Sequence, residues 1–216
     1  MIISIDGPAG SGKSTVAKII SNKLNIIHFN SGSLYRGVAA YLNSINFDIK
    51  GITLDSPIPD FELETEFIDG VQHVFVNKID FTSKLRNNEI SILSPFVSSN
   101  RTVRQRIDNC QRAFGKKNSL VLEGRDIGSF VFPNAEYKFY LDCNIEERAK
   151  RRYKEEVLKN PNITFKDIKN EIAKRDYIDK TKQIAPLVVP ENAIIIDSTN
   201  LTIEQVADKI LSHIKN

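Results

Sequence analysis

The chain has 216 residues, enough for one α/β domain that either stands alone or carries insertions. Hydrophobic residues make up 41% and charged residues 26%, and the formal net charge of +3 is too small to indicate a nucleic-acid partner. Cys110 and Cys143 lie far apart without metal-ligand spacing, and no apolar run approaches the roughly 20 residues that span a bilayer. We therefore expect a cytoplasmic protein with no disulfide, no membrane segment and no N-terminal signal.

Short apolar runs alternate with helical patterns along the chain, an arrangement typical of a parallel sheet with crossover helices. The apolar runs predict five strands, at residues 2–6, 26–29, 120–123, 137–142 and 193–197. The periodic segments predict helices that begin at Lys13, Ser33, Ile145 and Thr202, with a weaker helical pattern from Asp126. We therefore expect an α/β protein with a three-layer fold, in which helices flank one five-stranded parallel sheet.

Two segments depart from this alternation. Residues 50–88 contain an apparent hairpin, VQHVFVNKIDFTS, and we expect them to form part of an inserted subdomain. Residues 150–185 are mostly polar and charged, and they predict two helices separated at Asn160 and Pro161, with Thr164 capping the second. Because this segment has few apolar anchors, we expect it to be mobile and to close over a ligand.

A glycine-rich loop follows the first predicted strand and precedes the first predicted helix. Residues 7–14 read GPAGSGKS and fit the pattern G-x-x-x-x-G-K-[ST] of phosphate-binding loops, which requires this strand–loop–helix context. In such a loop backbone N–H groups bind phosphates, Lys13 reaches the β- and γ-phosphates, and the Ser14 hydroxyl binds Mg²⁺. The predicted ATP-binding residues are Gly7, Pro8, Ala9, Gly10, Ser11, Gly12, Lys13, Ser14 and Thr15.

Charged and polar residues near the ends of later strands predict a second anion site, because an open α/β sheet binds ligands beyond the carboxyl ends of its strands. They are Ser31 and Arg36 after the second predicted strand, Arg125 and Asp126 after the third, and Arg175, Asp179 and Lys182 on one face of a later helix. Together these residues indicate that the phosphoryl group passes to an anionic acceptor.

An alternative, a small GTPase, rests on two short motifs. Residues 77–80 match N-K-x-D and residues 48–51 match D-x-x-G. Fewer residues separate these motifs than the roughly 30 that one strand–helix crossover unit takes, and a GTPase sheet needs more than one such unit there. We therefore interpret Asn77 and Lys78 as a hairpin turn.

The motifs IDGPAGSGKST, SGSLYR, EGRDIGSFVFP, RD…D…APL and IIDSTNLTIEQV together resemble the bacterial cytidylate kinases, a group of nucleoside monophosphate kinases. The resemblance extends in order over essentially the whole chain. It implies one domain over residues 1–216, with a monophosphate-binding insert at about residues 30–90 and a lid at about residues 150–185. It also implies that ATP, with Mg²⁺, phosphorylates CMP and dCMP in pyrimidine nucleotide metabolism.

The resemblance also implies roles for single residues. The implied catalytic residues, which would hold phosphates during transfer, are Lys13, Arg36, Arg125 and Arg175. The implied substrate-binding residues are Ser31, Arg36, Arg104, Arg125, Asp126, Arg175, Asp179 and Lys182. Within this set Arg104 and Asp126 would read cytosine, and Asp179 would meet the ribose hydroxyls. Asn30, Pro95 and Lys182 stand where the family usually has Asp, Ser and Arg.

A phosphate acceptor is already an anion at neutral pH, so its phosphorylation needs charge neutralisation more than a base. We therefore expect the cations to be divided between core and lid, with Arg148 or Arg152 assisting Arg175, and to meet only on closure. We expect a monomer that binds the small molecules CMP, dCMP and ATP, without nucleic acid or membrane. Two alternatives remain: another kinase of this fold, such as an adenylate, thymidylate or shikimate kinase, or a nucleic-acid-associated ATPase that uses the basic run at residues 148–152.

Overall fold

The computed structural model describes residues 1–158 and 160–214. Its helices and strands are, in chain order, β1 (Ile2–Asp6), α1 (Lys13–Leu24), β2 (Ile27–Asn30), α2 (Ser31–Ser44), β3 (Leu63–Ile68), β4 (Val71–Val76), β5 (Ile79–Asp80), the 3-10 helix η1 (Thr82–Lys84), α3 (Asn88–Val97), α4 (Arg101–Gly115), β6 (Leu120–Gly124), the π-helical turn η2 (Ile127–Val131), β7 (Tyr137–Asp142), α5 (Ile145–Glu156), α6 (Phe165–Thr181), β8 (Ile194–Asp197) and α7 (Ile203–His213). The chain divides into two compact units: Met1–His28 with the residues from 121 onward form the first, and Phe29–Leu120 form the second. Within the described residues, no helix combines the length and apolar character needed to cross a membrane.

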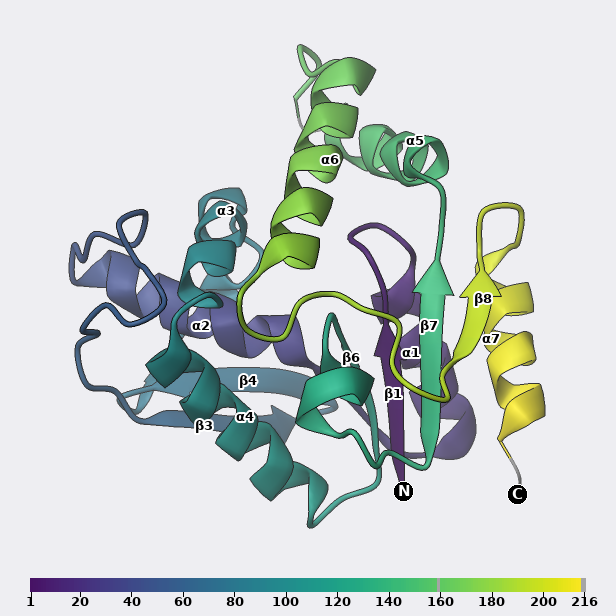
Figure 1. Cartoon of the computed structure of the whole chain (residues 1–216), viewed down its shortest axis with the longest axis horizontal. Helices are drawn as coiled ribbons and strands as arrows, with labels where there is room; N and C mark the ends of the chain where they lie inside the picture. The colour runs from purple at the N-terminus through teal and green to yellow at the C-terminus, as the bar shows by residue number, and fades with distance from the viewer. Residues whose placement is uncertain (159, 215–216) are drawn as a thin grey trace. The chain divides into compact units, whose positions relative to one another are not determined.

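A five-stranded parallel sheet has the strand order β2-β6-β1-β7-β8, and the first unit contributes β1, β7, β8 and parts of β2 and β6 (Figure 1). β1 pairs in parallel with β7, and β7 in parallel with β8. All five predicted strands are present, with bounds shifted by one residue at most. Because β1 lies between β6 and β7, the segment that follows β1 has a neighbouring strand on each side.

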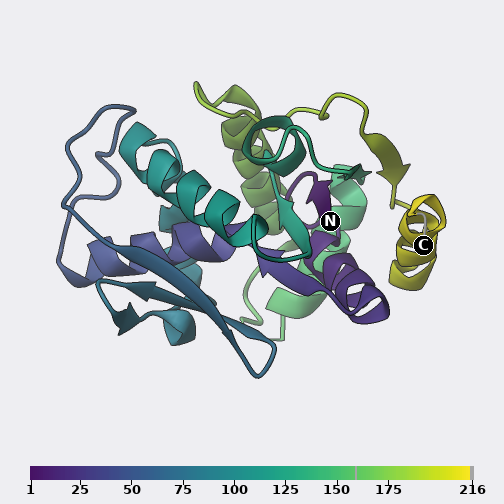
Figure 2. The same cartoon turned by 90° about the horizontal axis from the view of Figure 1, so that it is seen from below.

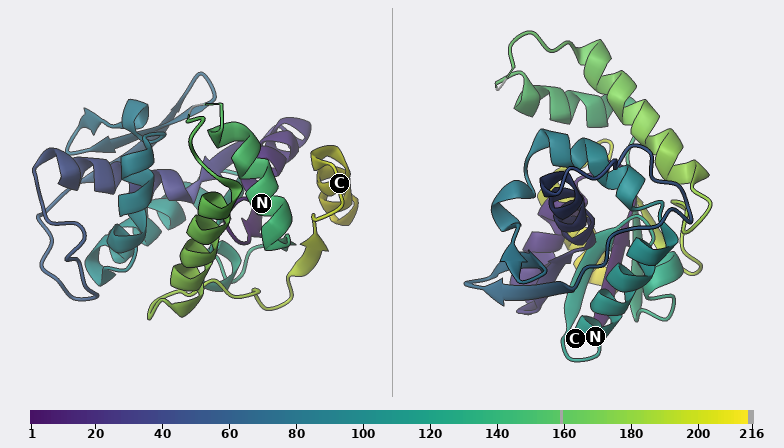
Figure 3. Two further views of the ribbon diagram at one scale, coloured as in Figure 1. Left: turned by 90° about the horizontal axis from the view of Figure 1, so that it is seen from above. Right: turned by 90° about the vertical axis from the view of Figure 1, so that its left-hand side faces the viewer.

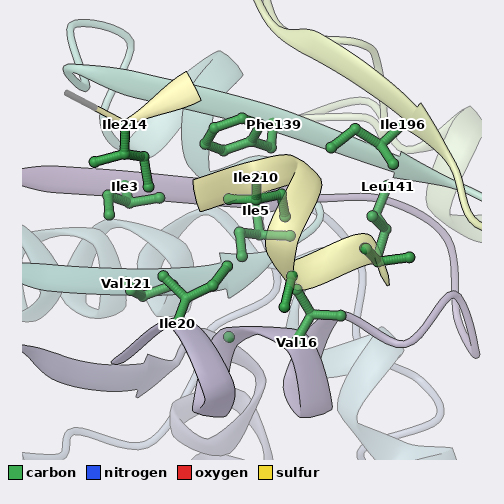
Figure 4. Packing of buried hydrophobic residues seen from close by; sticks show 13 residues of the cluster. Ile3, Ile5, Val16, Ile20, Val121, Phe139, Leu141, Ile196, Ile210 and Ile214 are labelled. Carbon is green, nitrogen blue, oxygen red and sulfur yellow. The ribbon is translucent and has the colours of Figure 1, made fainter. Parts of the chain in front are cut away.

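The main core of the first unit lies between the sheet and the helices α1 and α7, which pack against each other (Figure 4). Its buried residues are Ile3, Ile5, Val16, Ala17, Ile20, Val121, Phe139, Leu141, Ile196, Val206, Ala207, Ile210 and Ile214. Full burial of one such large aliphatic side chain stabilises the fold by about 1.5–3 kcal/mol, so this cluster holds the strand and helix on either side of the glycine-rich loop in place. The predicted cap of α7 is confirmed, since the Thr202 hydroxyl accepts from the Gln205 N–H at 3.2 Å.

The helices α5 and α6 pack on each other in the first unit (Figures 1 and 3). The predicted break between them is confirmed, and Thr164 caps α6 in a capping box with Asp167. Three buried residues, Ala149, Ile168 and Ile172, form a small core of their own between the two helices. The predicted mobility of this helix pair stays a prediction.

The second unit contains a three-stranded antiparallel sheet in the order β3-β4-β5. α2 packs on β4 and α4 packs on β3 (Figure 2). Between β4 and β5, Asn77 and Lys78 both have positive φ, 51° and 65°, as the two central residues of a type I′ hairpin turn require. The interpretation of this motif as a turn is therefore confirmed.

Several elements differ from the prediction. β3, α3 and α4 were not predicted, and the weak helical pattern from Asp126 becomes the short turn η2. The second helix begins at Ser31 rather than at Ser33, because the Asn30 side chain caps α2 by accepting from the Ser33 N–H at 3.1 Å.

Candidate active site

The loop between β1 and α1 packs closely against β7. A Cβ atom at Gly7, whose φ is +149°, would stand 2.2 Å from the carbonyl oxygen of Leu141. Gly10 and Gly12 have φ values of 77° and 94°, in the left-handed region that favours glycine. The glycines of the predicted phosphate loop are therefore required by its backbone.

Lys13 begins α1 and is buried. Its ammonium donates to the carbonyl oxygen of Pro8 at 2.6 Å and to the Ser11 hydroxyl at 3.4 Å. Burial and the charge of Arg125 lower the pKa of Lys13 to about 7. The ammonium thus lies within its own loop, and a phosphate bound there would favour its charged form by supplying negative charge.

Glu123, near the end of β6, is a candidate residue that the sequence reasoning missed. Burial opposes ionisation of this carboxyl, but the neighbouring His28 and Lys13 outweigh burial and hold the pKa of Glu123 below its ordinary value. The Ser14 hydroxyl donates to the same carboxylate, and His28 Nε2 lies 3.6 Å from it. The sequence offered only part of the signal, an acidic residue near the end of a predicted strand; that this strand lies beside the one leading into the phosphate loop, as is typical of a Mg²⁺ site, follows from the strand order.

Four predicted site residues of the first unit form one cluster around a fully buried carboxylate, that of Asp179. Arg125 Nε lies 2.8 Å and Arg175 Nε 3.2 Å from its Oδ2, and Lys182 Nζ lies 3.2 Å from its Oδ1. Burial alone would raise the pKa of Asp179, but the cations, Arg125 foremost, hold it well below its ordinary value. The prediction of one helical face is right for Arg175 and Asp179 but not for Lys182, which follows the end of α6 at Thr181 and still contacts Asp179.

This cluster brings a core cation and a lid cation together. Arg125 follows β6, whereas Arg175 lies on α6, and both contact Asp179. The expectation that such cations meet only on closure stays a prediction. The carboxylate placed between the cations offsets their repulsion, which is the physical reason that they can lie together.

Arg148 links α5 to the phosphate loop. Its Nη1 donates to the carbonyl oxygen of Ala9 at 3.0 Å, and its Nη2 donates to Asp176 of α6 at 2.6 Å. Arg152 is instead half-buried, with Nη2 3.9 Å from Glu171. Of the two lid arginines considered from the sequence, Arg148 is therefore the one that contacts the loop.

Asp126, the residue before η2, is buried in the first unit. Its side chain does not cap η2, while its carbonyl oxygen accepts from the N–H groups of Phe130 at 2.9 Å and Val131 at 3.1 Å. The backbone at Asp126 is thus fixed by η2.

The remaining predicted site residues, Ser31, Arg36 and Arg104, lie in the second unit. Arg36 Nη2 donates to the Ser33 hydroxyl at 3.2 Å and to Asn30 Oδ1 at 3.4 Å, and Ser31 is buried at the start of α2. The departure at position 30 thus leaves an amide oxygen, not a carboxylate, beside this guanidinium.

Arg104 is buried on α4. Its Nη1 donates to the carbonyl oxygen of Ser98 at 3.3 Å, and its guanidinium carbon lies 5.6 Å from the centre of the Tyr35 ring. These contacts hold an arginine in a buried position, where a charged group is retained only with partners.

Comparison with known sequences identifies the family of this chain. Residues 3–216 match the sequence model of the family described as cytidylate kinase. The cytidylate kinase of Caldicellulosiruptor bescii is 42% identical over 212 residues, which are 97% of this chain and 93% of that protein. The cytidylate kinase of Bacillus subtilis is 41% identical over 216 residues, covering 99% of this chain and 96% of that protein. The chain therefore belongs to the cytidylate kinase family.

Proposed function

We propose that this protein transfers the γ-phosphoryl group of ATP to CMP and to dCMP, giving ADP with CDP or dCDP. The observation that carries the proposal is the presence, in one unit, of a phosphate loop containing Lys13 and a cluster of three cations around Asp179. The loop suits the phosphates of the donor, and the cluster suits the phosphate of an acceptor. Relatives named cytidylate kinase support cytosine as the acceptor base.

The chemistry suits these residues. An oxygen of the acceptor phosphate attacks the γ-phosphorus, and the bond to the β–γ bridging oxygen breaks. The second pKa of a phosphate monoester is about 6, so this nucleophile carries no proton that a base must remove at neutral pH. Lys13 would bind the transferred group, while Arg125 and Arg175 would bind the acceptor phosphate, and together they offset repulsion between two polyanions.

The residues present fit Mg²⁺ bound with ATP. Within residues 1–158 and 160–214, no three His, Cys, Asp or Glu side chains gather as a metal cage. Mg²⁺ at a nucleotide is held largely by phosphates and water, with one or two protein oxygens. The Ser14 hydroxyl and the Glu123 carboxylate, which contact each other, would supply these oxygens. When bound, Mg²⁺ neutralises charge on the β- and γ-phosphates.

The roles in acceptor recognition that the family resemblance implies are assigned residue by residue. In the second unit we assign Arg36 to the acceptor phosphate and Ser31 and Arg104 to the nucleotide, with Arg104 serving the O2 and N3 acceptors of cytosine. In the first unit we assign Asp126 to the N4 amino group of cytosine. Uracil places an oxygen there, and leaving such a buried group unpaired costs about 1–3 kcal/mol.

Sugar recognition is assigned to Asp179, whose carboxylate would bind the ribose hydroxyls. Lys182, which contacts the same carboxylate, would remain beside the acceptor. A lysine supplies a point charge in place of the two-pronged guanidinium usual at this position in the family, so we expect a weaker grip on the phosphate.

Release of ADP, measured with ATP and a panel of acceptors, tests the proposal. CMP and dCMP should support turnover, UMP should support less, and AMP, dTMP and shikimate almost none. If AMP, dTMP or shikimate were preferred over CMP, the assignment of the acceptor would be wrong.

Two variants separate phosphate binding from base reading. Arg36→Ala should weaken all monophosphates alike, by about ten- to a hundredfold, because a charged contact contributes about 1.5–3 kcal/mol. Arg101→Ala is the matched control, because Arg101 lies on the surface of the same unit and pairs with Asp55. Asp126→Asn should narrow the difference between CMP and UMP, because an amide offers either a donor or an acceptor. An equal loss for every acceptor in Asp126→Asn would place base reading elsewhere.

We further propose that the protein acts as a monomer in the cytoplasm. The free thiols of Cys110 and Cys143 agree with a reducing compartment. Light scattering on a size-exclusion column would give the mass, and a dimer mass would contradict the first part of this proposal.

A further inference from the structure

Asp6 is a fully buried acidic residue at the end of β1, directly before the phosphate loop. Its two carboxylate oxygens accept from two successive backbone groups of η2. Oδ1 accepts from the Ile127 N–H at 2.8 Å, and Oδ2 accepts from the Gly128 N–H at 2.7 Å. One side chain therefore joins the strand that leads into the phosphate loop to the segment that follows Arg125 and Asp126.

Gly128 makes this close approach possible. A Cβ atom at that position would stand 2.6 Å from the hydroxyl oxygen of Ser4 and 3.2 Å from Asp6 Oδ2. Such contacts are shorter than packed side chains accept, so a larger residue would push the backbone of η2 away from β1.

The backbone around Asp126 is thus held from two directions. Its carbonyl oxygen accepts two N–H groups within η2, and the next two residues donate to Asp6. With so many of its backbone groups bonded, the peptide at position 126 has little freedom to rotate. This fixed backbone sets the direction in which the Arg125 and Asp126 side chains leave the chain.

Burying a carboxylate at position 6 costs free energy, because the charged group loses its contact with water. Burial raises the pKa of Asp6 to about 7, against the effect of its two N–H partners. An asparagine would have the same shape without a charge, but it has one accepting oxygen and one donating NH₂ group. Only a carboxylate accepts both N–H groups with separate oxygens. The sequence therefore retains an acidic side chain in a buried place, where its two acceptor oxygens fix the geometry of this segment.

We propose that Asp6 is a positioning residue for the acceptor nucleotide: it holds the Arg125–Asp126 segment in a fixed place relative to the phosphate loop. The proposal rests on the function proposed above. It predicts that loss of Asp6 weakens binding of the acceptor nucleotide and leaves binding of ATP unchanged. The phosphate loop that binds ATP is held by α1, β7 and its own glycines.

Asp6→Asn tests this directly. We expect the Kd for CMP, measured by titration calorimetry, and the KM for CMP to rise by about tenfold, as for one lost charged hydrogen bond. The KM for ATP should stay within about twofold of the unaltered value. Asp197→Asn is the matched control, because Asp197 also ends a strand and accepts a backbone N–H, that of Thr199, but lies on β8. It should change neither constant.

Gly128→Ala is a second variant, for use if Asp6→Asn fails to fold. It keeps the Asp6 carboxylate but displaces the backbone N–H at position 128 that donates to it. We expect the same result, a higher Kd and KM for CMP with an unchanged KM for ATP. Equal changes in the constants for CMP and ATP, or no change in either, would overturn the proposal. A general weakening of the fold would not separate the two substrates. If the unaltered protein itself neither bound nor phosphorylated CMP, the proposed function would fail instead.

Discussion

Replacing Asp179 by asparagine removes a charge while keeping the shape of the side chain. The carboxylate is fully buried and lies within 2.8–3.2 Å of Arg125, Arg175 and Lys182. Removing one partner of a buried ion pair costs about 3–5 kcal/mol, because the remaining charges stay buried without compensation. For a protein of this size each kcal/mol shifts the melting temperature by about 2–4 °C, so we expect a fall of roughly 6–20 °C at pH 7.

The stabilisation that Asp179 contributes should depend on pH. The pKa of Asp179 is held below its ordinary value in the folded protein, so its stabilisation is present above about pH 4 and is lost as the pH falls further. Thermal unfolding followed by circular dichroism between pH 3 and pH 8 should show the difference between Asp179→Asn and the unaltered protein shrinking only below pH 4. Asp208→Asn, which breaks an exposed pair with Lys23, is the control and should stay within about 0.5 kcal/mol.

An added anion gives an independent check of the same reasoning. Inorganic phosphate should raise the melting temperature of Asp179→Asn more than that of the unaltered protein, because it can occupy the place of the lost carboxylate. A melting temperature within about 2 °C of the unaltered protein, with no response to phosphate, would refute the account of the cluster.

Lys13→Ala should abolish ADP release, because the Lys13 ammonium is proposed to bind the phosphates of ATP. It should not lower the melting temperature, because burying this charged group costs folding free energy. Gly37→Ala should destabilise the second unit by about 1–3 kcal/mol in urea unfolding, because its Cβ would lie 2.4 Å from Val74 Cγ1. Because burial raises the pKa of Asp6 to about 7, the folded protein binds the proton of this carboxyl more tightly than the unfolded protein does. The contribution of this one group to the free energy of unfolding should therefore fall by about 3 kcal/mol from pH 4 to pH 7, a fall that Asp6→Asn should lack. Amide exchange at residues 150–185 should slow when ATP and CMP analogues bind together.

Local patterns predicted the parts of the fold that local rules control. A few adjacent residues determine each of these parts, which are the phosphate loop, the strands beside it and the caps at Thr164 and Thr202. The grouping of Arg175, Asp179 and Lys182 followed from helical spacing alone.

The elements that escaped prediction have particular reasons. α3 carries Pro95 inside the helix, where proline usually ends one. α4 did show apolar residues at helical spacing, Val103 and Ile107, after the capping residue Asn100. Its buried face also includes polar side chains such as Arg104, which obscured the apolar stripe.

Glu123 and Asp6 could not be assigned from neighbouring residues. Their roles depend on β6 lying beside β1 in the sheet, a pairing between segments more than a hundred residues apart. A sequence shows which residues end strands, but the order of strands decides which of those ends meet. For the same reason no spacing in the sequence places Arg125 near α6, where Asp179 lies between Arg125 and Arg175.

The position of Asp179 changes what binding of the acceptor requires. If the cations were bare and separate, bringing them together would oppose their mutual repulsion. Here one carboxylate holds Arg125 and Arg175 together, so in the function proposed above an acceptor phosphate would replace an anion between the two guanidinium groups. The exchange favours a dianion over a monoanion, because the carboxylate carries one charge and the phosphate nearly two at neutral pH. In the function proposed above, Asp179 would then accept from the ribose hydroxyls. On that proposal the same residue both stabilises the cation cluster and favours a fully ionised acceptor.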